Sequence, residues 1–174
     1  MKTPFSQRFG LTHPIMLAPM GSVSGGALAA AVSNAGGLGM VGGGYGDLPS
    51  MRRELETAAA AAKGPWGVGL ITWRATREAV ELALSFAPRA FFFSFGDAAP
   101  YADAVKAKGC ALVCQVQDLR GAREAKAMGA DFIVAQGAEA GGHGAARATL
   151  PLVPAVIDAV DPLPVLAAGG IADG

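Results

Sequence analysis

The sequence predicts an α/β fold in which parallel strands are covered by helices. Short apolar runs alternate with longer alanine-rich stretches at intervals of roughly 20–30 residues. The apolar runs are almost continuous in hydrophobicity, which is typical of strands that are buried on both faces. Because consecutive parallel strands need a crossover connection, the alternation predicts right-handed strand–helix–strand units.

The apolar runs and the stretches between them define the expected elements. Seven strands are predicted, over residues 14–18, 38–41, 67–71, 90–94, 111–115, 132–135 and 164–168. Six helices are predicted, over residues 25–35, 49–63, 76–86, 99–108, 119–128 and 150–160. Asp47, Asp97 and Asp118 stand where helix N-caps are expected. Glycines follow several helices, as a left-handed C-cap requires.

Two architectures share this alternation, an open doubly wound sheet and a (β/α)8 barrel. All of the predicted strands are similarly apolar, which favours a closed sheet without edges. A complete barrel takes about 250 residues, whereas this chain has 174. We therefore expect a single domain over residues 1–174 of the (β/α)8 TIM-barrel type. It would be incomplete at its C-terminal end, with about seven strands present and the last βα unit or units lacking.

Composition excludes several classes of protein. Hydrophobic residues make up 52% of the chain and charged residues 16%, which predicts a large core and excludes disorder. The 14 basic and 14 acidic residues balance, and no basic tract is present, so nucleic acid is not an expected partner. Near-zero net charge gives little protection against self-association, so a homo-oligomer is compatible with the sequence. Cys110 and Cys114 lack further metal-ligand neighbours and are expected to be reduced core residues.

The N-terminal segment has no apolar core of a signal peptide. No apolar run reaches the roughly 20 residues of a membrane span without glycine or proline. We therefore expect no membrane partner and a cytoplasmic location.

In both architectures, ligands bind at the C-terminal ends of the parallel strands. The residues expected there are rich in glycine and glutamine and lack a cluster of carboxylates. Backbone N–H groups and amide side chains suit a neutral, planar heterocycle with polar edges. They suit a divalent metal poorly, so no metal is expected. A pair of facing carboxylates for glycoside hydrolysis is also lacking.

The segment from Gln136 to Gly144 follows a predicted strand and contains four glycines in nine residues. It also carries His143, one of only two histidines, whose side chain suits proton transfer near neutral pH. We expect His143 to be catalytic; the alternative is a solvated loop histidine. Glu139 is either a second acid or base, or holds the loop by hydrogen bonds. His13 precedes the first predicted strand, at the opposite face, where a structural role is expected.

Two further segments have alternative interpretations. Gly169 and Gly170 follow the last predicted strand and either bind a phosphate or form a tight turn. Met20, after the first predicted strand, either packs under a flavin-like ring or is a core residue. The glycines of residues 36–44 flank a strand on both sides and so do not have the context of a dinucleotide-binding motif.

These motifs resemble the nitronate monooxygenase family, formerly called 2-nitropropane dioxygenases, which are FMN-dependent barrels. The resemblance runs through the whole chain, and its most specific part is Gln136-Gly137-Ala138-Glu139-Ala140-Gly141-Gly142-His143. The other matching segments are residues 14–20, 35–39, 66–69, 114–117 and 167–174.

The resemblance implies FMN as cofactor, and alkyl nitronates or nitroalkanes and O2 as substrates, with a carbonyl compound and nitrite as products. His143 would be the catalytic base that takes the α-proton of a nitroalkane, or would orient the nitronate. Residues implied to bind FMN are Met20, Gly21, Gln115, Gln136, Gly141, Gly142, Gly169 and Gly170.

Two other functions remain open from the sequence. One is an NAD(P)H-dependent flavin reductase of the related barrel group, acting on a quinone or an enoyl-thioester. The other is a truncated fragment without catalytic activity.

Overall fold

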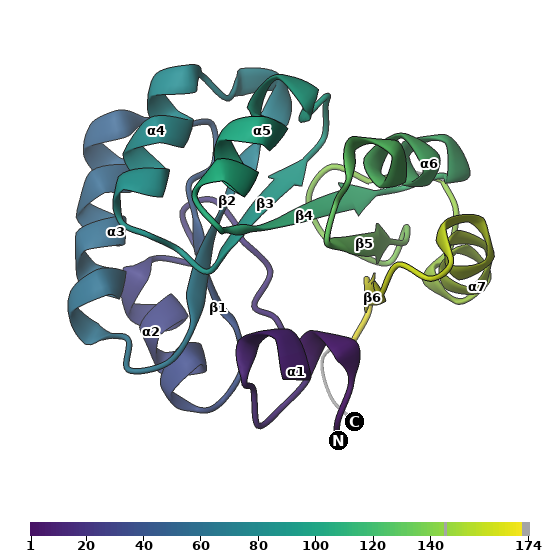
Figure 1. Ribbon diagram of the computed structural model, residues 1–174, viewed down its shortest axis with the longest axis horizontal. Helices are drawn as coiled ribbons and strands as arrows, with labels where there is room; N and C mark the ends of the chain where they lie inside the picture. The colour runs from purple at the N-terminus through teal and green to yellow at the C-terminus, as the bar shows by residue number, and fades with distance from the viewer. Residues whose placement is uncertain (145, 172–174) are drawn as a thin grey trace. The chain divides into compact units, whose positions relative to one another are not determined.

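The computed structural model describes residues 1–144 and 146–171. They form two compact units, Met1–Ala111 and Leu112–Gly174. Each unit alternates helices with parallel strands, as the sequence predicts (Figure 1). Residues 172–174, which belong to the last motif singled out in the sequence, lie outside the described residues.

The first unit contains three strands that pair in parallel and in chain order. Helices α2, α3 and α4 pack successively against one another outside the strands (Figure 1). The elements are α1 (Pro4–Phe9), α2 (Gly26–Asn34), β1 (Gly39–Gly42), α3 (Leu48–Ala61), β2 (Trp66–Ile71), the 3-10 helix η1 (Thr72–Arg74), α4 (Arg77–Ser85), β3 (Ala90–Ser94) and α5 (Ala99–Ala107).

The core of the first unit lies on both faces of its strands. In β3, all five residues are buried, including Phe91, Phe92 and Phe93. The register pairs Val68 of β2 with Phe91 and Val41 of β1 with Val68. Burial on both faces explains why these strands show no polar alternation in the sequence.

The second unit also contains three strands in parallel and in chain order. Helix α7 packs on β5 and β6, and α6 lies beside α7 (Figure 1). The elements are β4 (Ala111–Val116, whose first residue belongs to the first unit), α6 (Leu119–Met128), β5 (Phe132–Gln136), α7 (Thr149–Val160) and β6 (Val165–Ala168).

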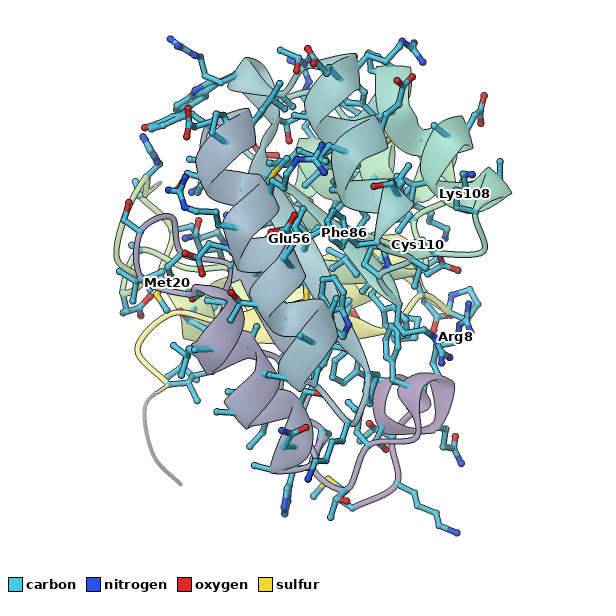
Figure 2. The ribbon with its side chains drawn as sticks, turned by 90° about the vertical axis from the view of Figure 1, so that its left-hand side faces the viewer. Arg8, Met20, Glu56, Phe86, Lys108 and Cys110 are labelled. Carbon is cyan, nitrogen blue, oxygen red and sulfur yellow. The ribbon has the colours of Figure 1, made fainter. Side chains whose placement is uncertain are left out.

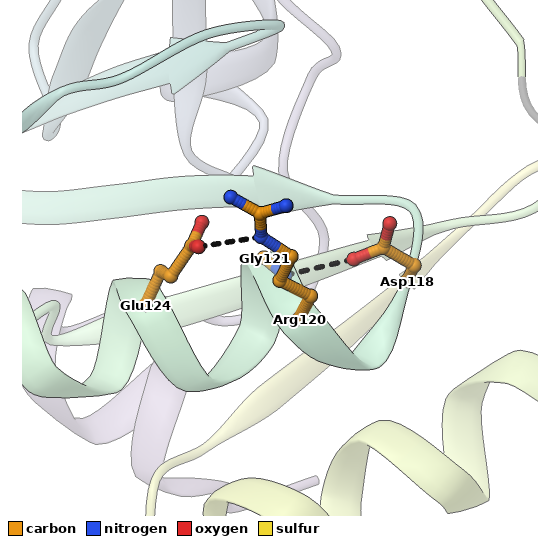
Figure 3. A network of polar contacts seen from close by, with 4 residues as sticks. All are labelled: Asp118, Arg120, Gly121 and Glu124. Atoms are coloured by element: carbon orange, nitrogen blue, oxygen red, sulfur yellow. Dashed lines mark hydrogen bonds and ion pairs between the residues drawn. The ribbon is translucent and has the colours of Figure 1, made fainter.

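Helix α6 begins sharply after β4 because Asp118 caps it. The Asp118 carboxylate accepts a hydrogen bond of 2.7 Å from the backbone N–H of Gly121 (Figure 3). One turn on, Arg120 and Glu124 form an exposed ion pair of 2.8 Å, which contributes little to stability. The predicted cap at Asp118 is therefore confirmed, and it fixes the chain directly after the end of β4.

The other two predicted caps differ in outcome. Asp47 accepts from the N–H of Ser50 and caps α3, as predicted. The prediction for Asp97 is wrong by one position, since Ala98 is the N-cap of α5. Asp97 instead accepts from the N–H of Ala99 at 2.9 Å, a local turn that precedes the helix.

The predicted strand over residues 14–18 is reduced to a single bridge between Met16 and Leu38. Pro14 and Pro19 have no N–H to donate, and the N–H of Met20 turns back to Ala18 O at 2.9 Å. The described residues therefore contain six strands, one fewer than expected.

Helix α1 was not predicted. Its signal is short: Thr3 and Ser6 form a reciprocal capping box, and Pro4 starts the first turn. The rings of Phe5 and Phe9 pack edge to face with centroids 5.4 Å apart, and both side chains are buried.

Two composition-based expectations bear on the described residues. Cys110 and Cys114 are both buried, as core positions require. Among the described residues, no helix has the length and apolar character needed to cross a membrane.

Candidate functional site

The loop from residue 137 to residue 148 leaves the C-terminal end of β5 and leads into α7. Gln136, the last residue of β5, pairs in register with Ala168 of β6 and is only 6% exposed. The N–H of Gly137 donates to Ala168 O at 2.9 Å, and the N–H of Ala138 donates to Arg147 O at 2.9 Å. Both ends of the loop are thus anchored by backbone hydrogen bonds. The loop follows the C-terminal end of a parallel strand, which is where proteins with parallel sheets bind their ligands.

Three glutamine side chains form a hydrogen-bonded cluster at this end of β4 and β5. Gln115 Nε2 donates to Gln136 Oε1 at 2.9 Å, and Gln117 Nε2 donates to the same oxygen at 2.7 Å. Gln117 Nε2 also donates to the backbone carbonyl of His143 at 2.7 Å. The cluster therefore connects the two strands to the loop that carries His143.

Glu139 fastens the loop to the start of α7. Its carboxylate oxygen Oε2 accepts from the N–H of Thr149 at 2.7 Å and from the Thr149 hydroxyl at 2.8 Å. These bonds to the ionised form lower the pKa of Glu139, the hydroxyl contributing most. Of the two roles left open by the sequence, the structure shows the one in which Glu139 holds the loop.

We expect Glu139→Gln to lower stability in a pH-dependent way. The folded-state pKa lies below the ordinary value of 4.5, so the carboxylate stabilises the fold above that value. The contribution is lost as the pH falls through the folded-state pKa. The urea midpoint of the variant should therefore lie below that of the unmodified protein at about pH 7, and the gap should narrow as the pH is lowered below 4.5. A gap that does not change with pH would contradict a stabilising carboxylate.

Gly169 and Gly170 form a turn directly after β6. Gly170 has a φ of +70°, in the left-handed region that favours glycine. A Cβ at Gly169 would lie 2.7 Å from the Thr149 hydroxyl and 3.1 Å from the N atom of Ala140. The turn itself thus requires both glycines, in agreement with the tight-turn interpretation, and their binding of a phosphate stays a prediction.

The tip of the loop is open. A Cβ at Gly141, Gly142 or Gly144 would meet no atom within 4 Å. His143 stands among these glycines, and the residue is exposed. Packing therefore does not explain these three glycines, in contrast to Gly137 and Gly169.

Met20 and Gly21 belong to the first unit, where they follow the bridge at Met16. The Met20 backbone carbonyl lies against Gly42, at the end of β1. A Cβ at Gly42 would collide with this carbonyl. A Cβ at Gly21 would lie 3.2 Å from Cα of Gly44. Met20, labelled in Figure 2, has a side chain that is 42% exposed, which corrects the alternative of a core methionine.

The structure brings together only part of the predicted set by direct contact. Gln115 and Gln136 are hydrogen-bonded, and Gly169 and Gly170 lie against the loop that carries His143. Sequence reasoning missed Gln117, which connects Gln136 to His143. The available signal was its spacing: Gln115 and Gln117 are two apart at the end of a strand, so their side chains share a face.

A sequence model of a family described as nitronate monooxygenase matches residues 2–78 and 69–174 of this chain. The chain belongs to the nitronate monooxygenase family. This is a family of flavin-dependent oxidoreductases, and it confirms the resemblance inferred from the motif around His143.

Two curated relatives show how far the similarity extends. A (3aS,4S,5R,7aS)-5-hydroxy-7a-methyl-1-oxo-octahydro-1H-indene-4-carboxyl-CoA dehydrogenase of Mycobacterium tuberculosis is 33% identical, over 100% of this chain and 50% of its own length. A nitronate monooxygenase of Neurospora crassa is 34% identical, over 93% of this chain and 54% of its own length. The chain thus spans about half the length of these relatives.

The solved structure of FabK from Thermotoga maritima superposes on this chain with a TM-score of 0.93 and 32% sequence identity. The superposition covers 100% of this chain and 56% of FabK. It confirms the predicted fold class, a TIM-barrel-type α/β fold of which the chain holds only part.

Proposed function

We propose that this chain is part of an FMN-dependent enzyme that oxidises alkyl nitronates and nitroalkanes with O2 to carbonyl compounds and nitrite. The observation that carries the proposal is the glutamine cluster at the ends of β4 and β5. It connects a buried amide, Gln136, to the exposed glycine loop that presents His143.

The donors of this region fit a flavin. Gln136 Oε1 already accepts two hydrogen bonds, so its Nε2 group is the part of the amide left to face a ligand. Carbonyl oxygens and ring nitrogens at a flavin edge are acceptors that match such a donor. Gly141 and Gly142 leave open space for a flat ring, and the N–H groups of Gly169 and Gly170 suit phosphate oxygens.

In the proposed reaction, His143 acts on the neutral nitroalkane. Its neutral imidazole takes the proton from the carbon beside the nitro group, and the C–H electron pair forms the C=N bond of the nitronate. Bound FMN would supply the electron-transfer chemistry between the nitronate and O2. In net balance, two nitronates and one O2 give two carbonyl compounds and two nitrite ions. Gln117 contacts the backbone carbonyl of His143 through a hydrogen bond of 2.7 Å.

A second candidate is flavin-dependent redox chemistry on a thioester. It is favoured by the similarity to the carboxyl-CoA dehydrogenase of Mycobacterium tuberculosis, which covers the whole chain. An enoyl-thioester or quinone reductase would draw its electrons from NAD(P)H and would have no need for a nitronate.

Flavin binding and oxygen uptake separate these functions. We expect the protein to bind added FMN and to consume O2 with ethyl nitronate in the absence of NAD(P)H, releasing nitrite. Oxygen uptake that requires NADH, or reduction of an enoyl-CoA, would favour the second candidate. A colourless protein that does not bind added FMN would exclude both for this chain.

A further inference from the structure

Gln117 occupies a fixed place between two structural elements. The register of β4 and β5 ends with Val116 opposite Ala135, so Gln117 is level with Gln136. The next residue, Asp118, caps α6 through its 2.7 Å bond to the N–H of Gly121 (Figure 3). The backbone of Gln117 is therefore held on both sides, which fixes the point from which its side chain extends.

The hydrogen bonds of Gln117 have only one consistent direction. A backbone carbonyl can only accept, so the contact with His143 O requires the NH2 group of Gln117. The second hydrogen of this group then points to Gln136, which must present its Oε1. Gln136 is consequently fixed with its own NH2 group on the other side of the amide. The carbonyl of His143 thus determines the orientation of the Gln136 amide through Gln117.

We propose that Gln117 is a positioning residue that couples the place of the His143 loop to the orientation of the Gln136 amide. This rests on the proposed function, in which His143 takes a proton and Gln136 faces the flavin. A loop anchored in this way keeps the imidazole at a defined distance from the substrate carbon. Displacements of about 1 Å at a reacting group cost up to about 100-fold in rate.

The test compares Gln117→Glu with Gln115→Glu in the intact protein. Both changes preserve side-chain shape, add one negative charge and remove a donor to Gln136 Oε1. Of the two glutamines, Gln117 is the one that donates to His143 O. The first readout is hydrogen exchange of the peptide covering residues 137–144, measured without flavin or substrate. We expect exchange about fivefold to tenfold faster in Gln117→Glu than in Gln115→Glu. Equal exchange in the two variants would overturn the proposal.

The second readout is kcat on nitroethane and on preformed ethyl nitronate. We expect Gln117→Glu to lose about 10- to 100-fold on nitroethane and far less on the nitronate, because only nitroethane needs the proton transfer. Gln115→Glu should lower both rates by a similar factor. Equal losses on both substrates in Gln117→Glu would overturn a positioning role toward His143. If the unmodified protein turns over neither substrate, the proposed function fails, while hydrogen exchange still decides whether Gln117 anchors the loop.

Discussion

Replacement of His143 by Asn is expected to lower turnover of neutral nitroalkanes by about 10²–10⁴-fold, the usual contribution of a general base. Asn keeps a polar side chain of similar reach but cannot take a proton. The backbone carbonyl that accepts from Gln117 is unchanged, so the glutamine cluster and flavin binding should remain. Turnover of preformed nitronates should fall much less, since the proton has already left. Steady-state rates on nitroethane and ethyl nitronate, with FMN content measured in parallel, give the comparison.

His13→Asn is the matched control. His13 lies before β1, and its backbone N–H donates to Gly36 O at 3.0 Å. None of the proposed site residues lies at that end of the strands. Both rates should stay near those of the unmodified protein. Equal loss on the two substrates in His143→Asn would rule out proton abstraction as the role of His143.

Replacement of Gly137 by Ala is expected to produce a large loss of stability. A Cβ at this position would collide with the N and hydroxyl oxygen of Thr149, at the first residue of α7. Backbone cannot yield as a flexible side chain can, so we expect a loss of about 3 kcal/mol or more in the free energy of unfolding. The displaced Thr149 would also lose its bonds to Glu139. Urea unfolding measures the loss.

Gly141→Ala, four residues along the same loop, is the matched control for Gly137→Ala. A Cβ there meets no atom within 4 Å, so its stability should stay within about 0.5 kcal/mol of the unmodified protein. Similar stability of the two variants would show that Gly137 is not pressed against α7 in solution.

The pattern of strands and helices was largely predictable because apolar runs and capping residues lie within the segments that they define. The ranges of β3 and α6 agree with the sequence prediction, and β5 and α7 differ from it by one residue. In α6, the Asp118 cap and the terminal Gly129 mark the two boundaries that the sequence predicts. The segment over residues 14–18 shows where this logic fails. Its hydrophobicity is that of a strand, but Pro14, at its start, and Pro19, directly after it, cannot donate a backbone hydrogen bond, and the pairing is restricted to Met16.

The types of residue in the candidate site could be predicted from the sequence, whereas their contacts were less predictable. The glycine loop around His143 could be found from composition alone, and so could Gln136 at the strand end. Thr149 lies so close to Gly137 and Gly169 that neither position has room for a Cβ. The sequence could not show this contact. It also could not show that Gln117 contacts a carbonyl 26 residues away, because that bond depends on the path of the loop.

An anaerobic mixing experiment tests most directly whether the residues around Gln136 and His143 serve flavin-dependent nitronate oxidation. The FMN-loaded protein is mixed with ethyl nitronate without O2 or NAD(P)H, and the visible flavin absorbance is followed. We predict that the absorbance of oxidised flavin disappears without O2, and that nitrite and acetaldehyde are found once O2 is admitted. Flavin that stays oxidised with the nitronate but is reduced by NAD(P)H would contradict the claim.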